Sequence, residues 1–264
     1  MKDVVVCGAS GKMGREVCRA VYEDLELSLV GAVDVSCVGQ DIGELVGLGK
    51  IGIFIEDDLK TILNKLSPRV VVDFTNPNVV MDNIRMVINC GINSVVGTTG
   101  FTGDDLAEIE SLLEGKDVGI VIAPNFAIGA VLMMKFSEKA LKYFSNAEII
   151  ELHHDKKVDA PSGTALKTAE MMSSSNNITC SNSTEREIIK GVRGGEFKNI
   201  HIHSVRLPGL VAHQEVIFGS KGQTLTIRHD SIDRTSFMPG VLMAVKQVEK
   251  FKGLTYGLDR LLDL

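Results

Sequence analysis

Runs of β-branched residues that alternate with helical patterns are the strongest constraint on the fold of this 264-residue chain. Arg69–Asp73 is almost entirely valine, which is the composition of a parallel strand buried on both faces. Four further runs in the first half predict strands: Lys2–Cys7, Leu27–Asp34, Ser94–Val96 and Asp117–Ala123. Because helical patterns separate these runs, the first half predicts an α/β domain with a parallel sheet and right-handed crossovers.

Three helices of this half are indicated by an apolar face or a start signal. Leu59–Leu66 has an apolar stripe at helical spacing. Asn76-Pro77 supplies an N-cap and a proline at the first helical position, and predicts a helix that runs to about residue 90. Thr102 with Asp105 predicts a capping box. Val35–Gly52 is expected to be a glycine-rich loop.

The pattern changes near residue 127, where the second half begins. A helix over Ile128–Phe144 is expected to precede a strand over Ala147–His154. Ser173–Thr184 is rich in Ser and Asn without periodicity and predicts a loop, whereas Phe237–Val248 returns to helical spacing. Short strand-like runs lie between these last two segments: Glu187–Lys190, His201–Val205, Glu215–Phe218 and Thr224–Arg228. The second half therefore predicts an α+β unit with a mixed, open sheet.

The composition disfavours several classes of partner. The net charge is −6, aromatic residues are 5% and there is no Trp, so neither a basic field nor a stacking surface for nucleic acid is expected. The longest uncharged stretch, Val118–Met134, is broken by Pro124-Asn125 and is too short for the ~20 apolar residues of a membrane span. Five cysteines form no C-x-x-C pair. We expect a cytoplasmic protein that binds neither nucleic acid nor membrane.

The turn Gly8–Gly14 follows the first expected strand and precedes the first expected helix, with the spacing G-x-x-G-x-x-G. Such glycines let the backbone approach a pyrophosphate, and the helix start offers free N–H groups. Asp34 ends the second strand about 20 residues later, where a ribose-binding carboxylate belongs. The alternative is a tight turn with no ligand. Because Val35 follows Asp34 and supplies no charge for a 2′-phosphate, we expect NADH to be preferred or both nicotinamide cofactors to be accepted.

The stretch from Glu151 to Ala165 combines two adjacent histidines, Lys157 and a Ser162-Gly163-Thr164 turn. Histidine exchanges protons near neutral pH, and lysine supplies positive charge or a proton. The turn offers N–H groups and hydroxyls that suit a carboxylate. Because strand neighbours point to opposite faces, His153 and His154 face one ligand only if the strand ends there. The alternative is a surface loop with one core histidine and an ordinary helix cap.

Together these residues resemble the bacterial dihydrodipicolinate (4-hydroxy-tetrahydrodipicolinate) reductase family. The resemblance extends over nearly the whole chain. Its most specific part is the string His-His-x-x-Lys-x-Asp-Ala-Pro-Ser-Gly-Thr. The segments that match are Gly8–Gly14, Gly97–Gly100, Ala123–Phe126, Glu151–Ala165, Val205–His213 and Ser236–Gly240. The resemblance implies NAD(P)H-dependent reduction of 4-hydroxy-tetrahydrodipicolinate to tetrahydrodipicolinate in lysine and diaminopimelate biosynthesis.

The resemblance also implies a domain plan and a role for each matched residue. Residues 1–126 and 235–264 would form a Rossmann domain, and residues 127–234 a domain that binds the substrate and assembles a homotetramer. His153 would be the acid–base residue and Lys157 its proton-donating partner. The dicarboxylate substrate would be bound by His154, Ser162, Gly163 and Thr164. The cofactor would be bound by Gly8, Ala9, Ser10, Gly11, Lys12, Met13, Asp34, Gly97, Thr98, Thr99, Ala123, Pro124, Asn125 and Phe126.

Two other functions remain open from the residues. Another two-domain nicotinamide-dependent dehydrogenase would share this plan, but a thiohemiacetal mechanism needs a reactive cysteine, and Cys90 lies in a helical pattern. A dinucleotide-sensing protein without catalysis would have no use for His153 and Lys157. No metal site is predicted, because His201 and His203 have no third ligand nearby in the sequence.

Overall fold

The structure is a computed structural model that describes residues 1–173 and 186–262. The chain forms two compact units. Unit 1 comprises Met1–Ile128 and Phe237–Leu264, and unit 2 comprises Gly129–Ser236. The predicted boundaries, 126/127 and 234/235, lie two residues before those of the structure. Among the described residues no helix has the length and hydrophobicity to cross a membrane.

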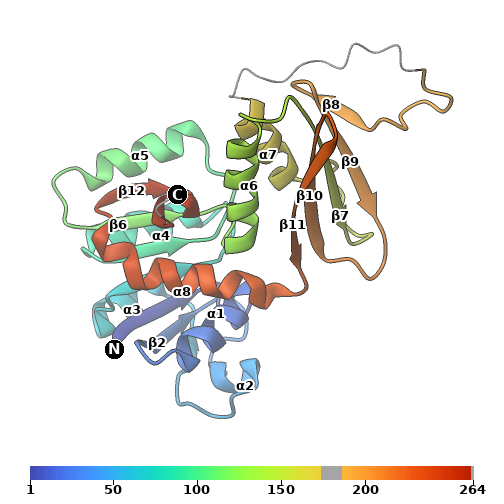
Figure 1. The fold of residues 1–264 in the computed structure, drawn as a ribbon. Coiled ribbons are helices and arrows are strands. Elements are labelled where there is room, and N and C mark those ends of the chain that lie inside the picture. Colours follow the sequence, from blue (N-terminus) through green and yellow to red (C-terminus); the bar gives the residue numbers. More distant parts are fainter. Residues whose placement is uncertain (174–185, 263–264) are drawn as a thin grey trace. The chain divides into compact units, whose positions relative to one another are not determined.

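Unit 1 is built on a seven-stranded sheet in the order β12-β6-β5-β4-β1-β2-β3, and every neighbouring pair is parallel (Figure 1). The strands are β1 (Lys2–Cys7), β2 (Leu27–Val33), β3 (Ile55–Glu56), β4 (Val70–Asp73), β5 (Asn93–Val96), β6 (Gly119–Ile122) and β12 (Gly253–Tyr256). The predicted parallel α/β domain is therefore confirmed.

Helices cover both faces of this sheet because successive strand side chains point in opposite directions. Val5 and Val71 pack with α3 (Leu59–Leu66) and α4 (Val80–Asn89) on one face, where α5 (Gly103–Leu113) also lies. On the other face, α1 (Lys12–Glu23) and α8 (Met238–Gln247) contact each other. Short 3-10 turns complete the C-terminal part: η1 (Arg234–Phe237), η2 (Val248–Lys250) and η3 (Leu258–Leu261). Val70, Val71 and Val72 have no exposed surface, which explains the run of three valines in β4.

Three features of unit 1 differ from the prediction. Val35–Gly52 contains the short helix α2 (Ile42–Val46), which Asp41 caps through the N–H of Gly43 and which is too short to show periodicity. The helix expected from residue 76 starts at Val80, because Asn76 accepts the N–H of Asn78 in a turn instead. No prediction covered the two edge strands, β3 and β12. The capping box of Thr102 and Asp105 is confirmed.

Unit 2 contains a mixed five-stranded sheet in the order β11-β10-β7-β9-β8, as predicted. Only β7 and β9 are parallel among its described strands. Its elements are α6 (Ile128–Ala140), β7 (Asn146–His153), α7 (Gly163–Ser173), β8 (Gly195–Phe197), β9 (Ile200–Arg206), β10 (Ala212–Ser220) and β11 (Gln223–Ser231). Ile149, Ile202 and Val216 pack with residues of α7 to form the core.

The predicted strand Glu187–Lys190 is wrong. The carboxylate of Glu187 accepts the N–H groups of Gly191 and Arg193, at 3.0 and 3.2 Å, and this holds the segment in turns. The strand in this part of the chain is β8. Ser173 ends α7, and the rest of the predicted loop Ser173–Thr184 lies outside the described residues.

Candidate active site

The glycine turn of unit 1 is shaped for close approach of a ligand. Gly8 has a φ of +75°, and a Cβ at this position would lie 2.5 Å from the carbonyl oxygen of Phe74. At Gly14 a Cβ would lie 1.9 Å from the carbonyl oxygen of Gly8, so only glycine lets α1 start this close to β1. Gly11 is the N-cap of α1 and provides no side-chain cap. First-turn N–H groups are therefore left for an anion such as a pyrophosphate.

Asp34 lies beside this turn, at the carboxyl end of β2. Its Oδ2 accepts the N–H of Ser10 at 3.0 Å, and its Oδ1 accepts the N–H of Ser36 at 2.9 Å. A carboxylate has about four acceptor positions, so two remain for hydroxyl groups. Val35 is 86% exposed. The donor and acceptor groups here fit the pyrophosphate and ribose of a dinucleotide.

The segments Gly97–Thr99 and Ala123–Phe126 follow the neighbouring strands β5 and β6, and Phe74 connects them to the glycine turn. Its ring leaves no room for a Cβ on Gly97, which would lie 2.1 Å from Cε1. The rings of Phe74 and Phe126 have centroids 5.8 Å apart. The segments predicted to bind the cofactor thus meet at the carboxyl edge of the sheet, where doubly wound sheets bind ligands.

Asp73, at the end of β4, was missed by the sequence analysis and organises this edge. It is buried and accepts hydrogen bonds from the Thr75 N–H at 2.9 Å and from the Thr98 hydroxyl at 3.2 Å. The amide of Asn83 donates to its other oxygen at 2.8 Å. The Thr98 side chain therefore points into the protein, toward Asp73.

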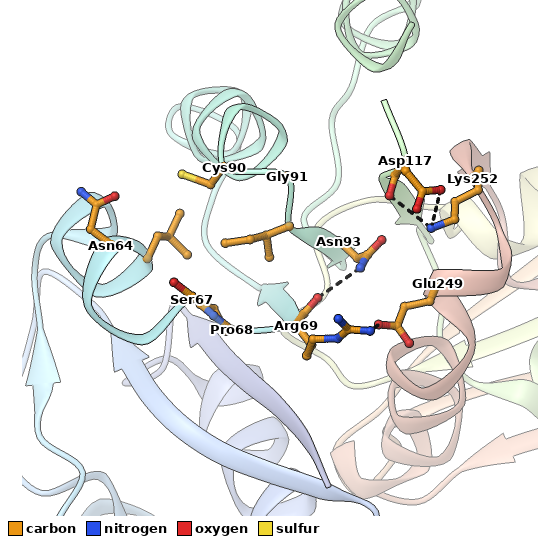
Figure 2. A pocket seen from close by; sticks show the side chains of 12 residues that line it. Asn64, Ser67, Pro68, Arg69, Cys90, Gly91, Asn93, Asp117, Glu249 and Lys252 are labelled. Atoms are coloured by element: carbon orange, nitrogen blue, oxygen red, sulfur yellow. Dashed lines mark hydrogen bonds and ion pairs between the residues drawn. The ribbon is translucent and has the colours of Figure 1, made fainter. Parts of the chain in front are cut away.

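Figure 2 shows a pocket of about 640 Å³ at the opposite edge, where β4, β5, β6 and β12 begin. Its charged groups pair with one another: Arg69 with Glu249 at 2.8 Å, and Lys252 with Asp117 at 2.9 Å. The Asn93 amide joins the carbonyl of Arg69 to the N–H of Gly119. Because these partners satisfy each other, we interpret the pocket as a junction of strand starts.

In unit 2 the face of the sheet that packs against α7 changes from apolar to polar along its strands. The register places Ile149 beside Ile202 and Val216, a wholly buried apolar row. The next row contains Glu151, Ser204 and Gln214. The row after that contains His153 with Arg206 and Ala212. Glu151 and Gln214 are still buried, whereas His153 and Arg206 in the last row are partly exposed, so the row at the end of β7 lies at the margin of the core.

Glu151 is the centre of this polar region. Arg206 donates to both carboxylate oxygens, at 2.7 and 2.9 Å, in a bidentate pair. The Nδ1 of His153 bonds to Oε2, and the N–H of Ser162 donates to Oε1 at 3.2 Å. Arg206 also donates to the carbonyl of Asp159 at 2.7 Å. One carboxylate therefore joins β7, β9 and the start of α7.

Burial and charge act in opposite directions on this carboxylate. Burial alone would raise the pKa of Glu151, but hydrogen bonds from Arg206, Ser204 and His153 outweigh it, so the pKa lies below its ordinary value. Burial lowers the pKa of His153, and the positive charges of Lys157 and Arg206 lower it further, against the raising effect of Glu151. Glu151 is thus ionised at neutral pH, and His153 is mainly neutral.

Lys157 and His154 lie in the turn after β7. The Nζ of Lys157 donates to both oxygens of Asp159, at 2.7 and 2.8 Å. His154 is exposed and lies beyond the end of the strand, as the orientation of both histidines toward one ligand requires. Arg206 links the two parts, because it contacts both Glu151 and the carbonyl of Asp159.

The Ser162-Gly163-Thr164 turn starts α7, as the sequence predicted. The hydroxyl of Ser162 accepts the N–H of Ala165 at 3.2 Å and so caps the helix. Gly163 and Thr164 are its first two residues, whose N–H groups have no partner inside a helix. These two groups suit a carboxylate, whereas Ser162 is largely occupied by its own turn and by Glu151.

Glu151 and Arg206 were quoted as parts of motifs but were given no role by the sequence analysis. Glu151 had a usable signal, since it lies two residues before His153 and strand side chains two apart share a face. Arg206 had none, because its approach to His153 depends on the pairing of β7 with β9 across 53 residues.

Two family models match this chain. The model described as "Dihydrodipicolinate reductase, N-terminus" covers residues 2–126, and the one described as "Dihydrodipicolinate reductase, C-terminus" covers residues 129–262. Among curated proteins, the 4-hydroxy-tetrahydrodipicolinate reductase of Syntrophomonas wolfei is 52% identical over 260 residues, which is 98% of each chain. The enzyme of the same name from Listeria monocytogenes is 49% identical over 98% of this chain and 99% of its own.

Solved structures agree with this assignment. A dipicolinate-bound dihydrodipicolinate reductase from Paenisporosarcina sp. TG-14 matches with a TM-score of 0.88 and 41% identity, over 98% of this chain and 99% of that one. An amine dehydrogenase from Mycobacterium smegmatis matches with a TM-score of 0.67 at 14% identity over 98% and 95% of the two chains, a similarity of fold alone. The match over both units and nearly the full length shows that this chain belongs to the dihydrodipicolinate reductase family.

Proposed function

We propose that this chain catalyses the NAD(P)H-dependent reduction of 4-hydroxy-tetrahydrodipicolinate to tetrahydrodipicolinate in lysine and diaminopimelate biosynthesis. The main support is the polar end of β7, where His153 lies with Arg206 and Lys157 beside the start of α7. The names of relatives at about 50% identity support the same substrate. A dinucleotide-sensing protein would not need this proton-exchanging cluster.

The cofactor, when bound, supplies a hydride, and the chain supplies anion binding and proton control. The turn Gly8–Met13, Asp34 and the segments after β5 and β6 would hold it. His153 exchanges a proton through Nε2, since Nδ1 is engaged by Glu151. Lys157 adds positive charge and a second proton source. The N–H groups of Gly163 and Thr164, with His154, bind the carboxylates of the substrate.

Substitutions separate these roles. His153→Ala or Lys157→Ala is expected to lower kcat by about 10²–10⁴-fold, the usual contribution of general acid–base catalysis. Thr164→Val is expected mainly to raise KM, because carboxylate binding acts equally in the ground and transition states. The assay follows NADH oxidation with enzymatically generated substrate. A wild-type chain without turnover would refute the function, and a His153→Ala variant within a few-fold of wild type would remove that residue from its role.

We also propose that NADH is preferred or that both cofactors are used. The support is Asp34, whose charge disfavours a 2′-phosphate, and the exposed Val35 beside it. We expect kcat/KM for NADH to equal or exceed that for NADPH, and Val35→Arg to shift the ratio toward NADPH. A large wild-type preference for NADPH would contradict this, and would indicate that Lys12 binds the phosphate.

A homotetramer built through unit 2 is the assembly we propose. The sheet face opposite α7 has half-buried apolar side chains, among them Ile150, Leu152 and Ile217, which favours a partner surface. Light scattering at micromolar concentration should give four times the monomer mass, and a monomer would refute the proposal. We further propose a cytoplasmic location, which cell fractionation would test.

A further inference from the structure

Glu151 has no exposed surface, although its environment keeps it ionised. A buried carboxylate is stabilised only when its lone pairs are taken by donors. Here the donors come from separate parts of the chain: the two terminal nitrogens of Arg206, the N–H of Ser162 and Nδ1 of His153. The position of the carboxylate is therefore fixed from several directions.

The contact with His153 determines which ring nitrogen has the proton. An ionised carboxylate only accepts hydrogen bonds, so the nitrogen that faces it must be an N–H. In the neutral ring Nδ1 is then protonated and Nε2 is bare. When the ring takes up a proton it does so at Nε2, and only there.

We propose that Glu151 is a positioning residue that holds the imidazole of His153 through Nδ1 and so fixes the tautomer in which Nε2 exchanges the proton. This inference rests on the function proposed above. Arg206 contributes to this positioning, because its bidentate pair with Glu151 keeps the carboxylate ionised and in place. Glu151 itself touches neither substrate nor cofactor in this scheme.

Glu148 provides a matched control on the same strand. It points to the opposite face of β7, where it bonds to Nε2 of His203 at 2.8 Å and to Arg193. Glu148→Gln removes the same charge from the same kind of neighbours and leaves His153 untouched. Light scattering must first show that this variant has the mass of the wild type.

The first test observes His153 by imidazole ¹⁵N NMR, with His153→Gln to assign the signal, and needs no turnover. In the wild type the neutral ring should have its proton on Nδ1. The charged groups that face this ring are Glu151, Lys157 and Arg206. Glu151→Gln removes the one negative charge among them, so the pKa of His153 should fall further, whereas Glu148→Gln should leave it unchanged.

The second test is the pH dependence of kcat. The limb on which kcat falls as His153 loses its proton should move to lower pH in Glu151→Gln, with a loss in kcat of about 10–100-fold, comparable to removing a carboxylate that orients a ligating histidine. KM should change less than kcat. Glu151→Asp keeps the charge and should recover part of kcat and the wild-type position of the limb. A merely structural role would leave the limb in place.

Different results would refute the proposed function and the proposed role of Glu151. If the wild type does not reduce the substrate, the proposed function is wrong, while the NMR result still decides the role of Glu151. The proposal is overturned if the neutral ring of wild-type His153 has its proton on Nε2, or if its pKa is the same in Glu151→Gln. If Glu151→Gln does not fold, the wild-type tautomer and the Glu151→Asp titration decide.

Discussion

Strand β7 presents a carboxylate–histidine–arginine cluster on each of its faces, and the two differ mainly in burial. On the α7 side, the exposed side-chain fractions of Glu151, His153 and Arg206 are 0%, 14% and 18%. On the other side, those of Glu148, His203 and Arg193 are 34%, 24% and 35%. The residue types are the same, so the comparison isolates the effect of solvent.

The hydrogen bonds among these three kinds of side chain behave differently when the carboxylate is buried. Within a single chain, water reaches all three side chains of the exposed cluster and screens their charges, so the ion pairs there are weaker. In the buried cluster the carboxylate of Glu151 has no contact with water, so water cannot replace a lost partner of this group. This fully buried carboxylate faces Nδ1 of His153, and an ionised carboxylate can only accept a hydrogen bond, so the contact assigns the proton of the ring to Nδ1.

The largest expected difference is in stability. Glu151→Gln removes the bidentate carboxylate partner of Arg206 at the edge of the core, so the free energy of unfolding should fall by about 3–5 kcal/mol. Urea denaturation followed by circular dichroism measures this. If the loss equals that of Glu148→Gln, the buried cluster contributes no more than the exposed one, and burial is not the cause of the difference.

Lowering the pH is expected to have a smaller effect on the stability of the folded chain. The pKa of His153 is lowered, so the unfolded chain binds its proton first, and stability should decrease as pH falls below about 6.5, the ordinary histidine value. Glu151, whose pKa is also lowered, stabilises above about 4.3 and loses this contribution only in stronger acid. The midpoint of thermal unfolding should fall by a few degrees between pH 7.5 and 5.5.

His229 should contribute to the same pH dependence of stability, because burial lowers its pKa too. We therefore expect His153→Gln and His229→Gln each to reduce the pH dependence. An unchanged dependence in His153→Gln would show that the ring is not held neutral by the fold.

The smallest effect is expected at the exposed cluster. Glu148→Gln should cost about 0.2–1 kcal/mol in the free energy of unfolding, the usual contribution of a solvent-accessible ion pair. Raising the salt concentration to 1 M should remove most of this difference, since charges are then screened within about 3 Å. A larger cost that is insensitive to salt would place this cluster in the same class as the buried one.

Elements with local signals could be predicted from the sequence. The run of three valines in β4, the glycine turn before α1 and the capping box of Thr102 each depend on neighbours in the chain. Elements with tertiary causes could not. The short helix α2 has no periodicity, and Glu187–Lys190 has the composition of a strand but is held in turns by the carboxylate of Glu187.

The residues of the candidate site also divide into those with a local sequence signal and those whose role depends on the tertiary structure. His153, Lys157 and the start of α7 lie within one motif, whereas Arg206 reaches Glu151 only through the register of β7 with β9. Asp73 looked like an ordinary strand end, and its role appears only when Thr75, Asn83 and Thr98 are seen around it. Arg206 and Asp73 therefore have no local sequence signal, in contrast to Glu151, which lies two residues before His153.

The position of β12 has a consequence for how the protein is made. Gly253–Tyr256 pairs with Gly119–Ile122, so the first sheet receives this strand only after the whole of unit 2 has been synthesised. On a ribosome, β6 leaves the exit tunnel long before its partner and presents a free edge during that interval. The continuous unit 2 is complete earlier than the discontinuous unit 1. The second unit can therefore fold first during synthesis, and β6 keeps a free edge until Gly253–Tyr256 has emerged.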